Sequence, residues 1–195
     1  SMEEQAKVPV FKAALIYGAI VGLASIVVSL LLYFIDQSLA SWAMIASTLI
    51  FIGLIVFMMV LFRKEYGKGF ASYGQLVLIS FIVGLIAAIL SAGYTFAIYE
   101  MDKGYLQDTK YTTIEKMDDK FDKMDARYQE KLSDDQYDVF EKRMRDQRKK
   151  QVKKIEGQTA FKIALNSIFG MVFMAVIVGL LAAIVIKKNP EPTLQ

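Results

Sequence analysis

Four long apolar runs, separated by polar segments, dominate the pattern of this sequence. The runs are Phe11–Ile35, Leu39–Phe62, Phe70–Tyr99 and Phe161–Ile186. Each exceeds the roughly 20 residues that a helix needs to cross about 30 Å of hydrocarbon. Because a backbone in lipid must satisfy its own polar groups, each run is expected to be helical. The chain is therefore predicted to be all-α, an integral membrane protein built as a four-helix bundle.

The segment between the third and fourth runs, Glu100–Gln158, is highly charged and has its own helical periodicity. One apolar stripe consists of Ile114, Met117, Phe121, Met124 and Tyr128, and a second consists of Tyr137, Phe140, Met144, Val152 and Ile155. Thr112 with Glu115, and Ser133 with Gln136, have capping-box spacing and predict where the two helices start. Ser72 with Gln75 has the same spacing and predicts a capping box that opens the third span. Two amphipathic helices joined by a short turn predict an extramembrane antiparallel helical hairpin.

The predicted organisation has three parts. Residues 1–99 hold the first three spans, residues 100–158 the hairpin, and residues 159–195 the fourth span with a short tail. The two stripes of the hairpin are expected to pack on each other rather than to hold a small ligand. Methionine-rich surfaces also suit protein partners. The candidate partner surface therefore consists of Met117, Phe121, Met124, Phe140 and Met144.

Small and polar residues within the spans are candidates for contacts between helices. Close approach of backbones through small residues drives helix association in lipid. This predicts packing contacts at Gly18, Gly22, Ser25, Ser80, Gly84 and Gly179. The most polar residues expected inside the spans are Asn166, Gln75, Ser47, Thr48 and Thr95. Asn166 is expected to make a hydrogen bond between helices rather than to contact a substrate.

Composition removes most enzymatic chemistry. The chain has no Cys and no His, so thiol nucleophiles, ordinary zinc sites and the commonest neutral-pH base are missing. No charged residue lies deep in a span, which argues against a proton-coupled carrier. Asp118, Asp122 and Asp125 share a helix face, but a solvated charged face explains them better than a cation site. The protein is expected to be no enzyme, with no catalytic residue, cofactor or metal.

The insert contains 15 Lys/Arg and 15 Asp/Glu, so it is electrically balanced, although its end is basic. A solvated helix face or a contact with anionic head groups explains that end better than nucleic-acid binding. Arg63, Lys64 and Lys68 between the second and third spans place both termini in the cytoplasm and the insert in the periplasm. Lys7 and Lys12 near the start support this orientation. Ser1 before Met2 is typical of a remnant of tag removal, and the first run is expected to be a retained span.

One family resemblance accompanies these patterns. The relevant features are Phe62-Arg63-Lys64, then Gly69-Phe70-Ala71-Ser72-Tyr73-Gly74-Gln75 opening the third span, the aromatic and acidic stretch Tyr94–Asp102, and Lys187-Lys188 before a Pro-containing tail. Together they resemble the bacterial four-span membrane family called domain of unknown function 4199, of the Bacteroidetes type. The resemblance covers roughly Val8–Pro192. It implies a bacterial inner membrane and carries no assigned activity.

Two functions remain open on the sequence. The first is a non-enzymatic interaction or assembly protein that uses the hairpin to bind a protein partner. The second is a small transporter or channel that uses polar residues such as Asn166 and Ser47, and four spans alone would require a homo-oligomer for this. A cavity reaching the middle of the membrane would favour the second, and a partner that depends on the insert would favour the first.

Overall fold

The computed structural model describes residues 10–188, and its named elements are six helices. They are α1 (Val10–Phe34), α2 (Ser41–Glu65), α3 (Tyr73–Met101), α4 (Lys103–Gln129), α5 (Asp134–Glu156) and α6 (Ala160–Ile186). Within residues 10–188 the β-structure is limited to one isolated antiparallel bridge between Ala71 and Lys188. Ser1, Met2, Lys7 and the Pro-containing tail, used above, lie outside the described residues.

Helices α1, α2, α3 and α6 correspond to the four predicted spans. Each is long and apolar enough to cross a membrane. Their surfaces also present large apolar side chains outward: Val185 is 83% exposed, Phe34 76% and Phe169 69%. Contiguous apolar surface of this kind is rare on a soluble monomer. The chain is accordingly a multi-pass membrane protein by the length and composition of its helices.

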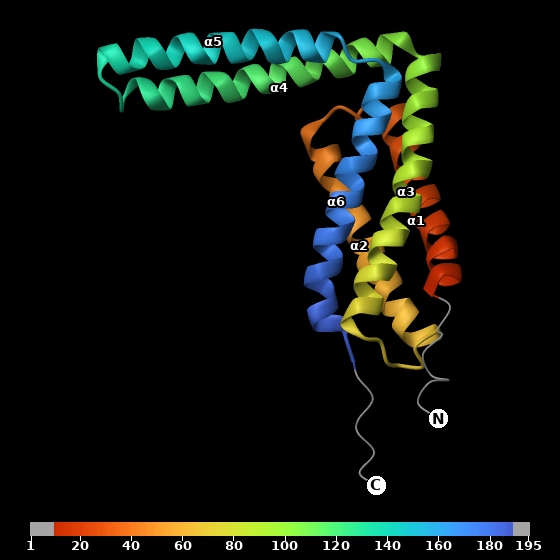
Figure 1. Cartoon of the computed structure of the whole chain (residues 1–195). Helices are drawn as coiled ribbons and strands as arrows, with labels where there is room; N and C mark the ends of the chain where they lie inside the picture. Colours follow the sequence, from red (N-terminus) through yellow and green to blue (C-terminus); the bar gives the residue numbers. More distant parts are fainter. Residues whose placement is uncertain (1–9, 189–195) are drawn as a thin grey trace. The chain divides into compact units, whose positions relative to one another are not determined.

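The residues divide into two compact units. One unit contains the chain up to Phe96 and from Ala164 onward, and the other is Ala97–Ile163. In the first unit, α1, α2, α6 and most of α3 run side by side as a bundle (Figure 1). Its core is apolar, and the largest fully buried side chains include Phe62, Ile55, Met59, Leu76 and Ile79.

The turn between α2 and α3 follows from local sequence chemistry. Gly69 adopts φ +92°, which glycine reaches without a Cβ penalty, while Lys68 is also at positive φ. A Cβ on Gly67 would collide with the carbonyl oxygen of Phe70. The predicted capping box at α3 is present: Ser72 N–H donates to Gln75 Oε1 at 3.0 Å, and Gln75 N–H to Ser72 Oγ at 3.3 Å.

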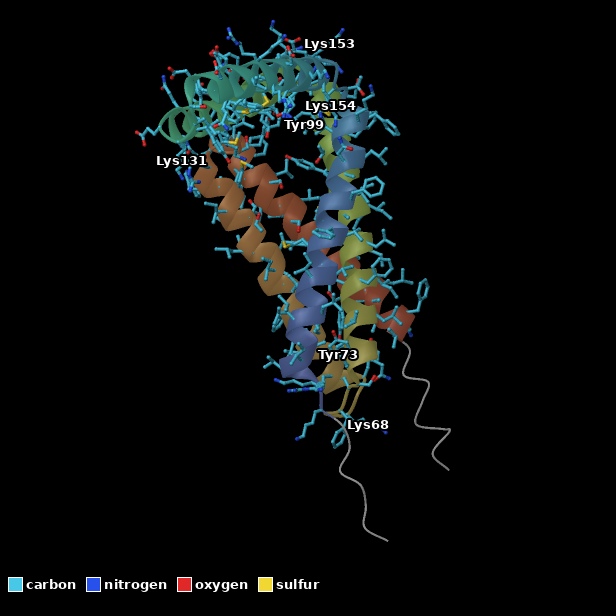
Figure 2. All side chains as sticks on the ribbon, turned by 60° about the vertical axis from the view of Figure 1, so that its left-hand side comes forward. Lys68, Tyr73, Tyr99, Lys131, Lys153 and Lys154 are labelled. Atoms are coloured by element: carbon cyan, nitrogen blue, oxygen red, sulfur yellow. The ribbon has the colours of Figure 1, made fainter. Side chains whose placement is uncertain are left out.

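At this end of the bundle, hydrogen bonds to backbone atoms connect the α2–α3 segment with the end of α6 and the residues after it. Arg63 Nη1 donates to the carbonyl oxygen of Ile186, the last residue of α6, at 2.8 Å. Ala71 and Lys188 exchange backbone hydrogen bonds at 3.0 and 3.1 Å. A cation near the C-terminus of a helix also interacts favourably with its dipole. Lys68 and Tyr73 mark this end in Figure 2.

The second unit contains α4 and α5, which contact each other through an ion pair, a hydrogen bond and a pair of rings. Arg148 pairs with Asp118 at 2.7 Å, the Tyr137 hydroxyl donates to Asp125 at 2.9 Å, and the rings of Tyr128 and Phe140 lie 4.6 Å apart. Phe121 is buried on the α4 side. A smaller apolar cluster of Tyr99, Leu106 and Ala160 belongs to the same unit.

The predicted start of the first insert helix was wrong. α4 begins at Lys103, and Asp102 is its N-cap, accepting a hydrogen bond from Tyr105 N–H at 2.8 Å. Thr112 therefore lies inside the helix, because Asp102, which directly follows α3, caps α4 ten residues before the Thr-x-x-Glu spacing begins. The second start was right: Ser133 precedes α5, although its side chain makes no capping hydrogen bond.

Candidate functional site

The hydroxyl side chains of the four spans gather around one cavity. The spans contain nine Ser and Thr residues, and seven of them line a cavity of about 330 Å³. These seven are Ser25 and Ser29 of α1, Ser47 and Thr48 of α2, Ser91 and Thr95 of α3, and Ser167 of α6. The two exceptions are Ser41, the first residue of α2, and Ser80, which contacts α6 elsewhere. Four separate helices thus direct their hydroxyl groups to the same place.

The seven hydroxyls lie at a common depth. The reference point is the end of each helix on the side of the α1–α2 connection. Each hydroxyl residue lies roughly five to ten residues from that end. At 1.5 Å per residue, this corresponds to a depth of about 8–15 Å. On the other side of the bundle, the core residues Tyr17, Phe62 and Leu76 are at most 4% exposed. The cavity is consequently confined to one half of the bundle and is closed toward the α2–α3 connection.

Four of the seven hydroxyls donate to a carbonyl of their own helix. Ser25 bonds to Val21, Thr48 to Met44, Thr95 to Ser91 and Ser167 to Ala164, with oxygen–oxygen distances of 2.7–2.9 Å. This local bonding is how Ser and Thr are tolerated inside membrane helices. Each of these oxygens keeps its lone pairs, so the cavity wall presents hydrogen-bond acceptors.

The Ser91 hydroxyl has a different environment. Its oxygen is buried and has no hydrogen-bond partner. A buried polar group without a partner destabilises a protein by about 1–3 kcal/mol. Ser29 and Ser47 likewise form no hydrogen bond with another described residue, so three hydroxyls on three helices remain free to donate and to accept.

The rest of the lining is apolar and uncharged. It consists of Val28, Ile50, Phe51, Gly170, Met171 and Met174. Thr48, Ile50 and Gly170 are exposed, so the cavity opens sideways at an edge formed by α2 and α6. Because the four spans are longer than the ~30 Å hydrocarbon core, an opening at this depth is expected to face acyl chains. The geometry therefore suits a neutral molecule with a polar group and an apolar tail.

The predicted packing glycines lie at close contacts between helices. A Cβ added to Gly18 would come within 2.6 Å of Ile86, and one on Gly22 within 2.7 Å of Leu90, both on α3. A Cβ on Gly84 would overlap Ala175 of α6, and one on Gly179 would come within 2.7 Å of Ser80. Ser25, also predicted for packing, lines the cavity instead.

The predicted polar residues fall into three groups. Ser47, Thr48 and Thr95 line the cavity. Gln75 caps α3, and Asn166 is exposed on the outer surface of α6, where no hydrogen bond to another described residue is present. The predicted interhelical bond of Asn166 is therefore not made within one chain. Ser29, Ser91 and Ser167 were not identified as cavity residues from the sequence, although counting depth from the helix ends would have aligned them.

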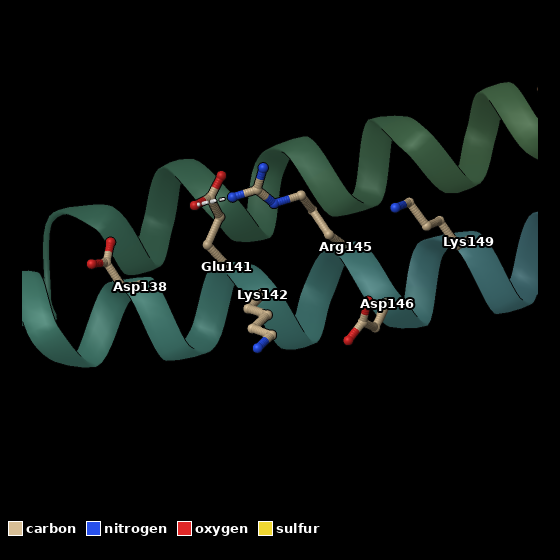
Figure 3. Close-up of a pocket in the computed structure, with 6 residues that line it drawn as sticks. All are labelled: Asp138, Glu141, Lys142, Arg145, Asp146 and Lys149. Carbon is tan, nitrogen blue, oxygen red and sulfur yellow. Dashed lines mark hydrogen bonds and ion pairs between the residues drawn. The ribbon is translucent and has the colours of Figure 1, made fainter.

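On the second unit, one face of α5 is a mixed-charge surface. No residue of α5 is buried. Asp138, Glu141, Lys142, Arg145, Asp146 and Lys149 surround a shallow hollow of about 390 Å³ (Figure 3). Glu141 and Arg145 form an ion pair at 2.7 Å. Three acids and three bases give this hollow no net charge.

The candidate partner residues of the sequence are distributed unevenly on α4 and α5. Phe121 is 8% exposed, Met124 is 39% exposed, and Met117, Phe140 and Met144 are half-buried. Among the acidic residues, Asp118 and Asp125 are engaged by Arg148 and Tyr137. Among the described residues, no group of three or more acidic side chains is arranged to hold a metal ion.

Comparison with known proteins identifies the family. The chain matches the family described as Protein of unknown function (DUF4199) over residues 16–188. Since this covers most of the chain, the protein belongs to that family, as its sequence motifs indicated. No curated protein and no solved structure matches the chain.

Proposed function

We propose that this protein is a non-enzymatic interaction or assembly protein of the bacterial inner membrane. In this proposal α4 and α5 form an extramembrane antiparallel hairpin that binds a protein partner. The observation that carries it is that α5, a helix of 23 residues, has no fully buried side chain. A helix whose apolar residues are at most half-buried gains limited stability from its own chain, and a partner would give these residues a further surface to contact.

The charge pattern of the hairpin indicates the type of partner. The hollow on α5 combines three acidic and three basic side chains, and the insert as a whole is balanced. Nucleic acids are bound by surfaces with a clear excess of positive charge. A surface of both signs instead complements another protein of mixed charge, where matched potentials determine specificity.

The experiment is site-specific photo-crosslinking of the full chain in its own membrane. A photoreactive amino acid replaces Val139, which is 54% exposed on α5, and in a control it replaces Val185, which is 83% exposed on α6. We expect one discrete protein adduct from position 139 and lipid adducts from position 185. Diffuse labelling from both positions would contradict the proposal.

A matched charge variant tests the surface itself. The double substitution Glu141→Arg and Arg145→Glu keeps an ion pair with the same spacing but reverses the two charges in the hollow. We expect it to abolish the adduct from position 139 while the helical circular dichroism of the protein is unchanged. A persistent adduct would mean that the partner does not use this face.

The hydroxyl-lined cavity supports a second candidate function, a small oligomeric transporter or channel. A polar cavity within the spans is the feature that such a function requires. The packed core around Phe62 and Leu76 closes the path toward the other side in this conformation. Flux of small neutral solutes into proteoliposomes, abolished by enlarging Ser91 to Phe, would support transport over assembly.

A further inference from the structure

We propose that the cavity between α1, α2, α3 and α6 is a binding site for a neutral lipid that carries a free hydroxyl group, of the glycerol monoester type. This inference does not depend on the hairpin and its partner. It rests on the convergence of seven hydroxyls, the partnerless Ser91 oxygen, the uncharged lining and the sideways opening.

The hydrogen-bonding capacity of the wall selects a hydroxyl-bearing ligand. Four hydroxyl groups already donate to carbonyls of their own helices, so they can only accept a hydrogen bond from a ligand. They belong to Ser25, Thr48, Thr95 and Ser167. Ser29, Ser47 and Ser91 can both donate and accept. A ligand hydroxyl is both donor and acceptor, so it satisfies both kinds of wall atom. A simple ester or ketone, which only accepts, would leave the accepting atoms unused.

The absence of charge in the lining excludes most ionic head groups. None of the thirteen lining residues is Asp, Glu, Lys or Arg. Moving an unpaired charge into such an environment is very unfavourable, whereas a neutral polar group needs only hydrogen-bond partners. Fatty-acid carboxylates and phosphate or ammonium head groups are therefore disfavoured relative to a glycerol group.

The opening determines where the apolar part of the ligand lies. Thr48, Ile50 and Gly170 form the exposed edge of the cavity on α2 and α6. A polar head bound inside leaves its chain to pass this edge into the surrounding acyl chains. The volume of about 330 Å³ is at the lower end of the range for ligand pockets, which accommodates a head group and the first part of a chain.

The test uses the full chain in phosphatidylcholine nanodiscs and a monoacylglycerol carrying a diazirine near its head. After photolysis, labelled positions are mapped by mass spectrometry. We expect labelling concentrated on the lining, including Met171 and Met174. Excess 1-oleoylglycerol should reduce it strongly, whereas oleate, methyl oleate and octadecene, which have no neutral hydroxyl, should have little effect.

Variants separate recognition from folding. In the triple variant Ser29→Ala, Ser47→Ala and Ser91→Ala, no hydrogen bond to the protein is lost. Each neutral hydrogen bond changes affinity by roughly two- to tenfold. We expect the triple variant to lower the apparent affinity for 1-oleoylglycerol by roughly tenfold or more, with an unchanged or higher melting temperature. The single variant Ser91→Ala should lower the apparent affinity for 1-oleoylglycerol by a smaller factor. It replaces the triple variant in this test if the triple variant fails to fold.

Two serines outside the cavity provide matched controls. Ser41→Ala changes an exposed residue of α2, and Ser80→Ala removes a hydrogen bond to α6 without touching the cavity. Both should bind the probe as the parent does. Labelling spread evenly over exposed residues such as Phe169 and Val185 would overturn the proposal by showing that the cavity does not bind the probe. Equal competition by octadecene would overturn it by showing that the hydroxyl group is not recognised.

Discussion

The hydroxyl of Ser80 donates a hydrogen bond of 2.6 Å to the carbonyl oxygen of Ala175, joining α3 to α6. Ser80 is 1% exposed, and the neighbouring Gly179 leaves room for its side chain. This is a polar contact between two spans at a point where both backbones approach closely. It indicates that the α3–α6 interface is held by small-residue packing together with a direct hydrogen bond.

Replacing Ser80 with Ala should weaken this interface. Hydrogen bonds between membrane helices contribute on average about 0.6 kcal/mol, with a maximum near 1.7 kcal/mol. We expect a loss of stability in that range, measured by thermal unfolding in detergent. Ser41→Ala, at an exposed position, is the control and should leave the midpoint unchanged. An equal midpoint for Ser80→Ala would show that the bond contributes nothing measurable.

Gly84 and Gly93 of α3 form a matched pair for testing packing. A Cβ on Gly84 would overlap Ala175, whereas one on Gly93 would meet nothing within 4 Å. Gly84→Leu should destabilise the bundle by about 1–3 kcal/mol through overpacking. Gly93→Leu should be neutral or slightly stabilising, because glycine is a poor helix former. Equal thermal stability of the two variants would mean that α3 and α6 do not pack as described.

Phe121 should be the most sensitive residue of the α4–α5 pair. It is 8% exposed and lines a hollow shared with Met144 of α5, so its replacement by Asp removes a buried ring from the contact between the two helices. We expect Phe121→Asp, alone or with Phe140→Asp, to reduce helicity and to expose residues 103–156 to protease. Val139→Asp on the 54% exposed surface of α5 is the control. Protease resistance that is the same in both variants would rule out a packed α4–α5 pair.

The pKa of Tyr137 is raised because its hydroxyl donates a hydrogen bond to Asp125, whose negative charge opposes ionisation. The protonated phenol is thus favoured in the folded state. The hydrogen bond between Tyr137 and Asp125 stabilises the folded state fully at pH values below the ordinary tyrosine pKa of about 10. This stabilisation is lost as the pH rises through the raised pKa of Tyr137. Titration of Tyr137 by carbon NMR should show a midpoint above the ordinary tyrosine value of about 10. In Asp125→Asn the midpoint should fall toward the ordinary value, and an unchanged midpoint would contradict the bond.

The proposed orientation can be tested with single cysteines because the chain has none of its own. Ser133→Cys lies between α4 and α5, and Lys68→Cys lies between α2 and α3. If the insert is periplasmic, a membrane-impermeant maleimide should label position 133 in intact cells and position 68 only after lysis. The reverse pattern would show that the basic residues of the insert set the topology.

The sequence alone determined the spans, because four apolar runs longer than the bilayer core leave the backbone no alternative to helices. It also placed the capping box of Ser72 and Gln75, whose atoms are three residues apart and need no tertiary contact. It could not place the cavity. Ser91 and Ser167 are far apart in the chain, and each looks like an ordinary small residue of its own helix. Only the rotation and depth of packed helices bring their hydroxyls together.

Asn166 is a second residue whose environment could not be predicted from the sequence. Its polarity within a span predicted a hydrogen bond between helices, yet the rotation of α6 places it on the outer surface. Side-chain type determined that these helices enter lipid, since hydrophobicity is a sum over residues and needs no partner. Which face of each helix meets another was decided by the tertiary structure, because packing depends on the fit of all four surfaces at once.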